Sequence, residues 1–246
     1  MNLSGEDYTY FLDFVEKNEK KYSYGASFGY KEIPNNYFEN TYKLLKNFNY
    51  ISVREKQGQE IIKNILETKV EVVLDPTLLL NKEEWTRISK YQSRKREYIL
   101  LYIIALTPSI IEFTKKLAKE YNCDIVYINH SYKIEFGMIN IRDAGPEEFL
   151  GYLRNAKYVV TSSFHGVVFS INFEKQFFFE LSKAKGNFNS RLENIIDMLD
   201  LNEREIVNGS TNSVNNINYK RVNAILNNQR KQSIKFIQNI LEEYNE

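Results

Sequence analysis

The stretch YILLYIIA, residues 98–105, decides the fold class of this chain. A short run of aliphatic and aromatic residues without polar alternation is typical of a central parallel strand that is covered on both faces. Pro108 follows it, and proline fits the first turn of a helix because that turn needs no hydrogen bond from its nitrogen. We therefore predict a strand followed by a helix, the repeating element of parallel α/β sheets.

The same alternation of strand-length and helix-length patterns continues on both sides of this stretch. On the amino-terminal side we expect strands at 21–28, 50–53 and 70–74 and helices at 37–48 and 55–67. On the carboxyl-terminal side we expect strands at 124–128, 158–161 and 177–181 and helices at 108–121, 146–155, 165–173, 191–201 and 217–244. The sequence thus predicts an α/β fold with two Rossmann-like halves and parallel sheets, in which the first half has only three strands and is incomplete.

The charged segment KYQSRKRE, residues 90–97, lacks an apolar period and marks the expected boundary between the halves. We predict a partial Rossmann-like domain at residues 1–90 and a second Rossmann-like domain at residues 91–210, whose strand ends are candidate ligand sites. A carboxyl-terminal helix is expected within residues 211–246.

Composition excludes several classes of function. Lys and Arg number 33 against 32 Asp and Glu, so no net field attracts nucleic acid, and we expect no nucleic-acid partner. One cysteine and two histidines exclude a disulfide framework and a cysteine-built zinc site, and nothing in the sequence predicts a metal or a cofactor. No apolar run is long enough for a transmembrane segment. We expect a cytoplasmic protein, with the inner face of the membrane as an alternative location.

The most informative strand end is YVVTSSFHGVVF, residues 158–169, which passes from strand to helix within a few residues. Ligands of parallel sheets bind where helix amino ends meet the carboxyl ends of strands. Ser162 or Ser163 can cap the helix, Gly166 permits close approach of the backbone to a ligand, and His165 stands at the mouth of the site. The alternative interpretation, ordinary caps and a hydrogen-bonded boundary histidine, stays open.

Two further strand ends carry charged residues. Arg54 follows the strand at 50–53 and could bind a carboxylate or phosphate, although an ion pair with Glu55 or a neighbour is the simpler interpretation. Asp75 follows a buried strand, and Pro76 locks a turn that we expect to aim the carboxylate outward. An acid at such a place is more often a turn residue than a catalytic one.

A polar loop, residues 183–191, enters a helix after the last strand of the second half. Lys183, Lys185 and Arg191 bring positive charge to this loop. A solvated charged loop explains the composition equally well.

At these same places the sequence resembles the polysaccharide pyruvyl transferase family. The matching stretches are SYGASFG (23–29), ISVREKQG (51–58), VLDPTLLL (73–80) with Trp85, YILLYII (98–104), AGPEEFLGYLRNAKYVVTSSFHGVVFSINFEKQF (144–177) and NFNSR (187–191). The resemblance implies a GT-B-like pair of domains. It also implies transfer of a pyruvyl group from phosphoenolpyruvate to a sugar diol as a cyclic ketal, in surface or exopolysaccharide synthesis. The acceptor would be a glycan or a lipid-linked sugar.

The resemblance also implies roles for individual residues. His165 and Arg54 would be catalytic, with His165 in acid–base chemistry and Arg54 holding the anionic groups of the donor from the facing half. The remaining donor-binding residues would be Ser162, Ser163, Phe164, Gly166, Asp75, Asn189 and Arg191.

Two departures from the family pattern matter. Many relatives carry an arginine where this chain has Ser163, and we predict that Arg191 supplies the missing charge. Relatives usually also have about a hundred more residues, ending with a GSDQVWN-like segment just before the region that matches residues 2–5. We therefore expect this chain to be a fragment or a shortened product.

Two other functions remain possible from the sequence. A sugar-nucleotide-dependent glycosyltransferase of similar fold would need an acidic residue near the strand ends of the second half to hold a ribose. A truncated, non-catalytic donor-binding remnant is the third hypothesis.

Overall fold

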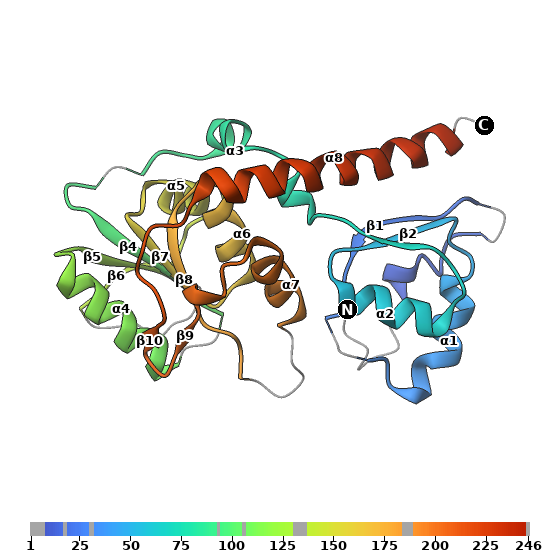
Figure 1. Cartoon of the computed structure of the whole chain (residues 1–246), viewed down its shortest axis with the longest axis horizontal. Helices are drawn as coiled ribbons and strands as arrows, with labels where there is room; N and C mark the ends of the chain where they lie inside the picture. Colours follow the sequence, from blue (N-terminus) through green and yellow to red (C-terminus); the bar gives the residue numbers. More distant parts are fainter. Residues whose placement is uncertain are drawn as a thin grey trace. The chain divides into compact units, whose positions relative to one another are not determined.

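The computed structural model describes residues 8–16, 19–29, 32–92, 94–104, 107–129, 137–183 and 189–244. The chain forms two compact units, each built on a parallel sheet (Figure 1). The first unit comprises Met1–Leu79, Lys183–Met198 and Asn223–Glu246, and the second comprises Leu80–Ser182 and Leu199–Val222. The predicted α/β class with parallel sheets is confirmed.

The sheet of the first unit has three parallel strands in the order β1-β2-β3. They are β1 (Tyr22–Ala26), β2 (Tyr50–Val53) and β3 (Val70–Val72), joined through α1 (Asn35–Leu45) and α2 (Lys56–Ile65). One face buries a core made of Phe11, Phe28, Leu45, Ile51, Val53, Ile61, Ile62 and Val70. The three-stranded count agrees with the expectation of a small first half.

The sheet of the second unit has five parallel strands in the order β6-β5-β4-β7-β8. They are β4 (Tyr98–Tyr102), β5 (Asp124–Ile128), β6 (Ile139–Ile141), β7 (Tyr158–Thr161) and β8 (Gln176–Phe179). Its helices are α3 (Lys82–Ile88), α4 (Pro108–Glu120), α5 (Pro146–Asn155) and α6 (Phe164–Asn172). The strand predicted at 98–105 forms as β4, and it is the central strand because it lies between β5 and β7.

Alternate residues of the second sheet pack against different helices. Ile99 and Leu101 of β4 join Val160 and Phe178 in a core with the apolar side of α4. The opposite face is covered by α5 and α6 (Figure 1). This two-sided burial explains why β4 is apolar at every position rather than at every second one.

The strand order reverses beside β4. The chain runs from β4 outward through β5 to β6, and then returns to place β7 on the other side of β4. In open parallel sheets the two connections diverge at such a switch point, and ligands bind outside the carboxyl ends of the strands there. The topology therefore directs attention to the carboxyl ends of β4 and β7.

The chain ends with α7 (Ser190–Leu199), the short hairpin of β9 (Ile206–Val207) and β10 (Ser210–Thr211), and α8 (Tyr219–Tyr244). Asn208 and Gly209 form the tight turn of this hairpin, and both have positive φ as such turns require.

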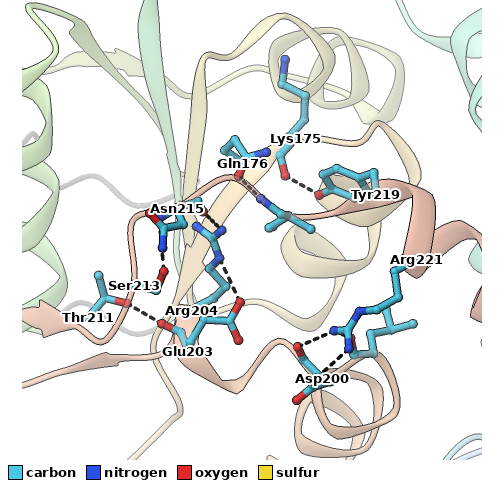
Figure 2. A network of polar contacts seen from close by, with 12 residues as sticks. Lys175, Gln176, Asp200, Glu203, Arg204, Thr211, Ser213, Asn215, Tyr219 and Arg221 are labelled. Carbon is cyan, nitrogen blue, oxygen red and sulfur yellow. Dashed lines mark hydrogen bonds and ion pairs between the residues drawn. The ribbon is translucent and has the colours of Figure 1, made fainter.

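A polar network fastens residues 200–221 to the second unit (Figure 2). The Ile217 N–H donates to Gln176 Oε1 at 2.9 Å, and the Tyr219 hydroxyl donates to the Lys175 carbonyl. Arg204 is fully buried, lies 5.5 Å from the ring centre of Phe178, and donates to a backbone carbonyl of the same segment. These contacts explain why the segment groups with the second unit.

Residues 223–246 group with the first unit because of contacts that sequence patterns do not reveal. Ser233 of α8 accepts the Leu74 N–H at 2.9 Å, and Phe236 packs beside the rings of Tyr24 and Tyr50. The predicted domain ranges 1–90, 91–210 and 211–246 stay predictions.

Several elements of the second unit were not predicted, among them α3 and β6. α3 begins with a reciprocal cap in which Asn81 accepts the Glu84 N–H and Glu84 accepts the Asn81 N–H, a spacing that the sequence does contain. β6 has only three residues, too few for a periodic signal. In the described part of the chain, no helix combines the length and apolar character needed to cross a membrane.

Candidate functional site

The predicted site residues fall into two groups, one in each unit. Arg54, Asp75, Asn189 and Arg191 belong to the first unit, and residues 162–166 belong to the second. Each group lies at the carboxyl edge of its sheet or at the start of a helix, as the sequence predicted.

Arg54 follows β2 and forms an ion pair with Asp75, which follows β3. Arg54 Nη1 donates to Asp75 Oδ2, while Asp75 Oδ1 accepts the Thr77 N–H at 3.0 Å and the Thr77 hydroxyl at 2.6 Å. Asp75 is therefore both a turn residue and the partner of Arg54. The simpler interpretation of Arg54 as part of an ion pair holds, with Asp75 and not Glu55 as the partner.

The Asp75 carboxylate is 4% exposed, so the prediction that the turn aims it outward is wrong. Burial by itself would raise the pKa of this carboxyl. The two hydrogen bonds from Thr77 and the positive charge of Arg54 outweigh burial, and the pKa lies below its ordinary value. Asp75 therefore stays ionised and holds the guanidinium in place.

Glu55 is a second buried acid at this edge, 1% exposed, at the N-cap position of α2. Its Oε1 accepts the Ser27 hydroxyl at 2.8 Å, which ties the end of β1 to the start of α2. Burial raises the pKa of the Glu55 carboxyl, and the Ser27 bond and the charges of Arg54 and Arg191 oppose that rise.

Arg191 lies in the first turn of α7, close enough to Arg54, Glu55 and Asp75 for their charges to act on it. Burial and then the like charge of Arg54 lower the pKa of Arg191, and the two acids counter this. Asn194 of the same helix donates to the Arg54 carbonyl at 3.3 Å and so holds α7 beside α2.

The polar loop before α7 is only partly described. Asn189 precedes the helix, and its carbonyl accepts the Glu193 N–H at 2.9 Å. Residues 184–188 of the predicted loop, including Lys185, lie outside the described residues. The idea that Arg191 replaces an arginine at position 163 stays a prediction.

In the second unit, Ser162 joins the two strands of the switch point. Its Oγ accepts the Ile104 N–H at 3.0 Å, so the residue after β7 is bonded to the residues that follow β4. The Ser162 hydroxyl therefore links the ends of β4 and β7 by a hydrogen bond, and the N-cap position of α6 belongs to Ser163.

Ser163 occupies the N-cap position of α6, but its side chain makes no capping hydrogen bond. The expectation that one of the two serines caps the helix is therefore met in position only. The backbone N–H of Ser163 instead donates to Thr161 Oγ1 at 3.0 Å.

Gly166 packs directly on Thr161. A Cβ added at position 166 would lie 2.2 Å from Thr161 Oγ1 and 2.9 Å from Thr161 Cβ. The structure thus supplies a packing reason for glycine at this position. Close approach of a ligand to Gly166, which the sequence suggested, stays a prediction.

His165 is exposed in the first turn of α6, and its ring meets the Phe164 ring edge-on at a centroid distance of 5.4 Å. The amino end of α6 carries the positive end of the helix dipole. An imidazole and a helix amino end at the carboxyl edge of a parallel sheet can together bind an anion and move a proton.

Sequence reasoning missed Glu180, at the carboxyl end of β8. It is 2% exposed, its N–H donates to the Thr161 carbonyl at 3.0 Å, and its Oε2 accepts the hydroxyl of Thr107, the N-cap of α4. An acid directly after the aromatic run at 177–179 was the available signal. Thr161 was also missed as a polar centre, because two of its partners, Tyr102 and Glu180, are distant in sequence.

Comparison with protein families matches residues 2–180 to the family described as Polysaccharide pyruvyl transferase. No curated protein matches the chain significantly.

Several solved structures are similar. UDP-GlcNAc 2-epimerase from Methanocaldococcus jannaschii is 15% identical with a TM-score of 0.47, and the match covers 81% of this chain and 62% of that one. A variant of the wall teichoic acid polymerase TagF, soaked with CDPG, is 12% identical with a TM-score of 0.46, covering 87% and 63%. The glycosyltransferase SnogD from Streptomyces nogalater is 7% identical with a TM-score of 0.37, covering 74% and 60%. The chain spans less than two thirds of the length of each.

Proposed function

The chain belongs to the polysaccharide pyruvyl transferase family, and from that premise we propose that it binds phosphoenolpyruvate and transfers the pyruvyl group to a sugar diol as a ketal. The observation that carries this proposal is that the matched region includes both carboxyl edges, with Arg54 and Asp75 on one and residues 162–166 on the other. The acceptor would be a glycan or a lipid-linked sugar in surface or exopolysaccharide synthesis.

The reaction needs an acid and an anion site. Protonation of the methylene carbon of phosphoenolpyruvate makes C2 electrophilic, and one sugar hydroxyl adds there with loss of its proton. Phosphate then leaves, and the second hydroxyl adds to C2 with loss of its proton, which the departing phosphate can accept, to close the ketal. The products are the ketal and inorganic phosphate, so the step needs no oxidant or reductant.

His165 suits the proton transfers because imidazole titrates close to neutral pH. Its exposure at the start of α6 leaves the ring accessible to a ligand. We propose that the amino end of α6, from Phe164 to Gly166, binds the donor phosphate, as helix amino ends commonly do.

Arg54 suits the carboxylate or phosphate of the donor because a guanidinium has several N–H donors, and Asp75 accepts from Nη1. Asp75 would hold the guanidinium in one orientation. Arg191, in the first turn of α7, adds positive charge near Arg54. Asn189 directly precedes α7.

The sugar-nucleotide hypothesis needs an acid at the strand ends of the second unit, and Glu180 lies at one of them. Its carboxylate is buried and already accepts the Thr107 hydroxyl. Holding a ribose would require Glu180 to leave this environment, and pyruvyl transfer requires no such change.

Calorimetry on the full chain tests the proposal, with phosphoenolpyruvate and a nucleotide-sugar as the two probes. We expect wild type to bind phosphoenolpyruvate, and Arg54→Lys and His165→Gln each to weaken it by about tenfold, about 1.4 kcal/mol. The matched control is Arg96→Lys, since Arg96 is exposed and pairs with Asp124 at the amino end of β5.

Each other outcome contradicts part of the proposal. Binding of the nucleotide-sugar alone would support a glycosyltransferase. Binding of phosphoenolpyruvate without pyruvate incorporation into a glycan acceptor would support a donor-binding module, and a chain carrying the amino-terminal segment of longer relatives is the comparison for that assay.

A further inference from the structure

The Thr161 side chain, fully buried at the end of β7, connects three elements of the second unit. Its hydroxyl donates to the Tyr102 carbonyl at the end of β4 and accepts the Ser163 N–H at the start of α6. The Thr161 carbonyl accepts the Glu180 N–H that follows β8. One residue therefore joins both strands of the switch point, the neighbouring strand and the helix that carries His165.

The first turn of α6 rests on this hydroxyl. Gly166 has no Cβ, and a Cβ there would lie 2.2 Å from Thr161 Oγ1, well inside van der Waals contact. The helix can therefore approach β7 this closely only with glycine at position 166. Together, the Ser163 hydrogen bond and the Gly166 contact hold the turn at both of its ends.

We propose that Thr161 is a positioning residue that sets the orientation of the first turn of α6, and thereby of His165. The functional importance of this positioning rests on the proposed function, in which that turn binds phosphate and His165 transfers protons. Thr161 acts through Ser163 and Gly166 and does not itself contact the donor.

Valine has nearly the shape of threonine and cannot make either hydrogen bond. Thr161→Val would leave the Ser163 N–H and the Tyr102 carbonyl without the Thr161 hydroxyl, and Ser163 is buried. A buried polar group without a partner is costly, so the turn is expected to move to find one. Thr161→Ser retains the hydroxyl and should retain the orientation.

A purely structural role would lower stability without moving His165. Thr114→Val is the matched control because Thr114 is equally buried in the same unit, and its hydroxyl donates only within α4, to the Ile110 carbonyl at 2.7 Å. It removes the same kind of bond at a place that does not touch α6.

The experiment uses the imidazole signals in NMR spectra of the full chain, which has only two histidines, so His130→Gln assigns His165 directly. We expect Thr161→Val to shift the His165 signals and its titration midpoint. Thr161→Ser and Thr114→Val should leave both unchanged. Unchanged His165 signals in Thr161→Val would overturn the proposal. Fluorescence of Trp85, which packs on Phe169 of α6 at 4.9 Å, checks that each variant is folded. If Thr161→Val does not fold, Thr161→Ala removes the same hydroxyl without adding a methyl group.

Calorimetry with phosphoenolpyruvate completes the test. Thr161→Val should weaken binding by about tenfold, while Thr161→Ser and Thr114→Val stay within about twofold of wild type. If wild type fails to bind phosphoenolpyruvate, the proposed function fails, and the NMR comparison still decides whether Thr161 orients His165.

Discussion

The ion pair between Arg54 and Asp75 permits a quantitative test of the first unit. Asp75→Asn keeps the size of the side chain and an oxygen that can accept both bonds from Thr77. It removes the negative charge that faces Arg54. The substitution therefore isolates the ion pair from the turn.

The expected cost follows from burial. Removing one partner of a buried ion pair costs about 3 to 5 kcal/mol, because the other charge remains in a poorly hydrated place. The side chain of Asp75 is 3% exposed and that of Arg54 is 21% exposed, so water reaches part of the guanidinium. We expect the lower end of the range, about 3 kcal/mol in the free energy of unfolding.

Urea unfolding at pH 7, followed by far-UV circular dichroism, measures this loss. Trp85 is the single tryptophan and lies in the second unit, so its fluorescence follows that unit separately. The control is Glu39→Gln, which breaks an exposed pair with Lys43 one helical turn away and should leave the free energy of unfolding nearly unchanged.

The dependence on pH gives a second check. The pKa of Asp75 is lower in the folded chain than its ordinary value of 3.8, so the carboxylate stabilises the fold above that pH. This stabilisation is lost as the pH falls through the pKa of Asp75 in the folded chain. Near that pH, the difference in the free energy of unfolding between wild type and Asp75→Asn should become smaller. A difference below about 0.5 kcal/mol at pH 7 would refute the reasoning.

Three further substitutions test other contacts. Gly151→Ala places a Cβ 1.7 Å from the backbone carbonyl oxygen of Lys90. Urea unfolding followed by Trp85 fluorescence should therefore show a decrease of about 2 kcal/mol in the free energy of unfolding, even though alanine favours helix. Thr107→Val removes the hydroxyl that donates to the buried Glu180 carboxylate. The same fluorescence measurement should show a decrease of at least about 2 kcal/mol in the free energy of unfolding. Ser233→Ala removes the side chain that accepts the Leu74 N–H. Urea unfolding followed by circular dichroism should show a decrease of about 1 to 3 kcal/mol in the free energy of unfolding. No change would contradict the role of α8 in the first unit.

Local patterns were sufficient for most elements of this chain. The apolar run at 98–105 predicted a central strand, and β4 is covered on both faces, because such a run is soluble only when both sides are buried. The residues that follow strands, Arg54, Asp75 and Ser162 among them, were found because parallel sheets expose these positions at one edge.

Partners distant in sequence could not be read from such patterns. Which acid pairs with Arg54 depends on strand order, since β3 lies beside β2 and brings Asp75 next to it. Whether Asp75 points outward depends on packing. Asp75 does form a turn with Thr77, but its side chain is buried, so the expectation of an outward carboxylate was wrong.

The amino-acid order was thus enough to specify the α/β class, the strand that occupies the middle of the second sheet and the edges where chemistry can occur, because these follow from periodicity and burial. The hydrogen bond from Thr161 to Tyr102, the burial of Glu180 and the return of α8 to the first unit follow from the folded arrangement. They depend on which segments, tens to more than a hundred residues apart, lie in contact, and short-range patterns carry no information about that.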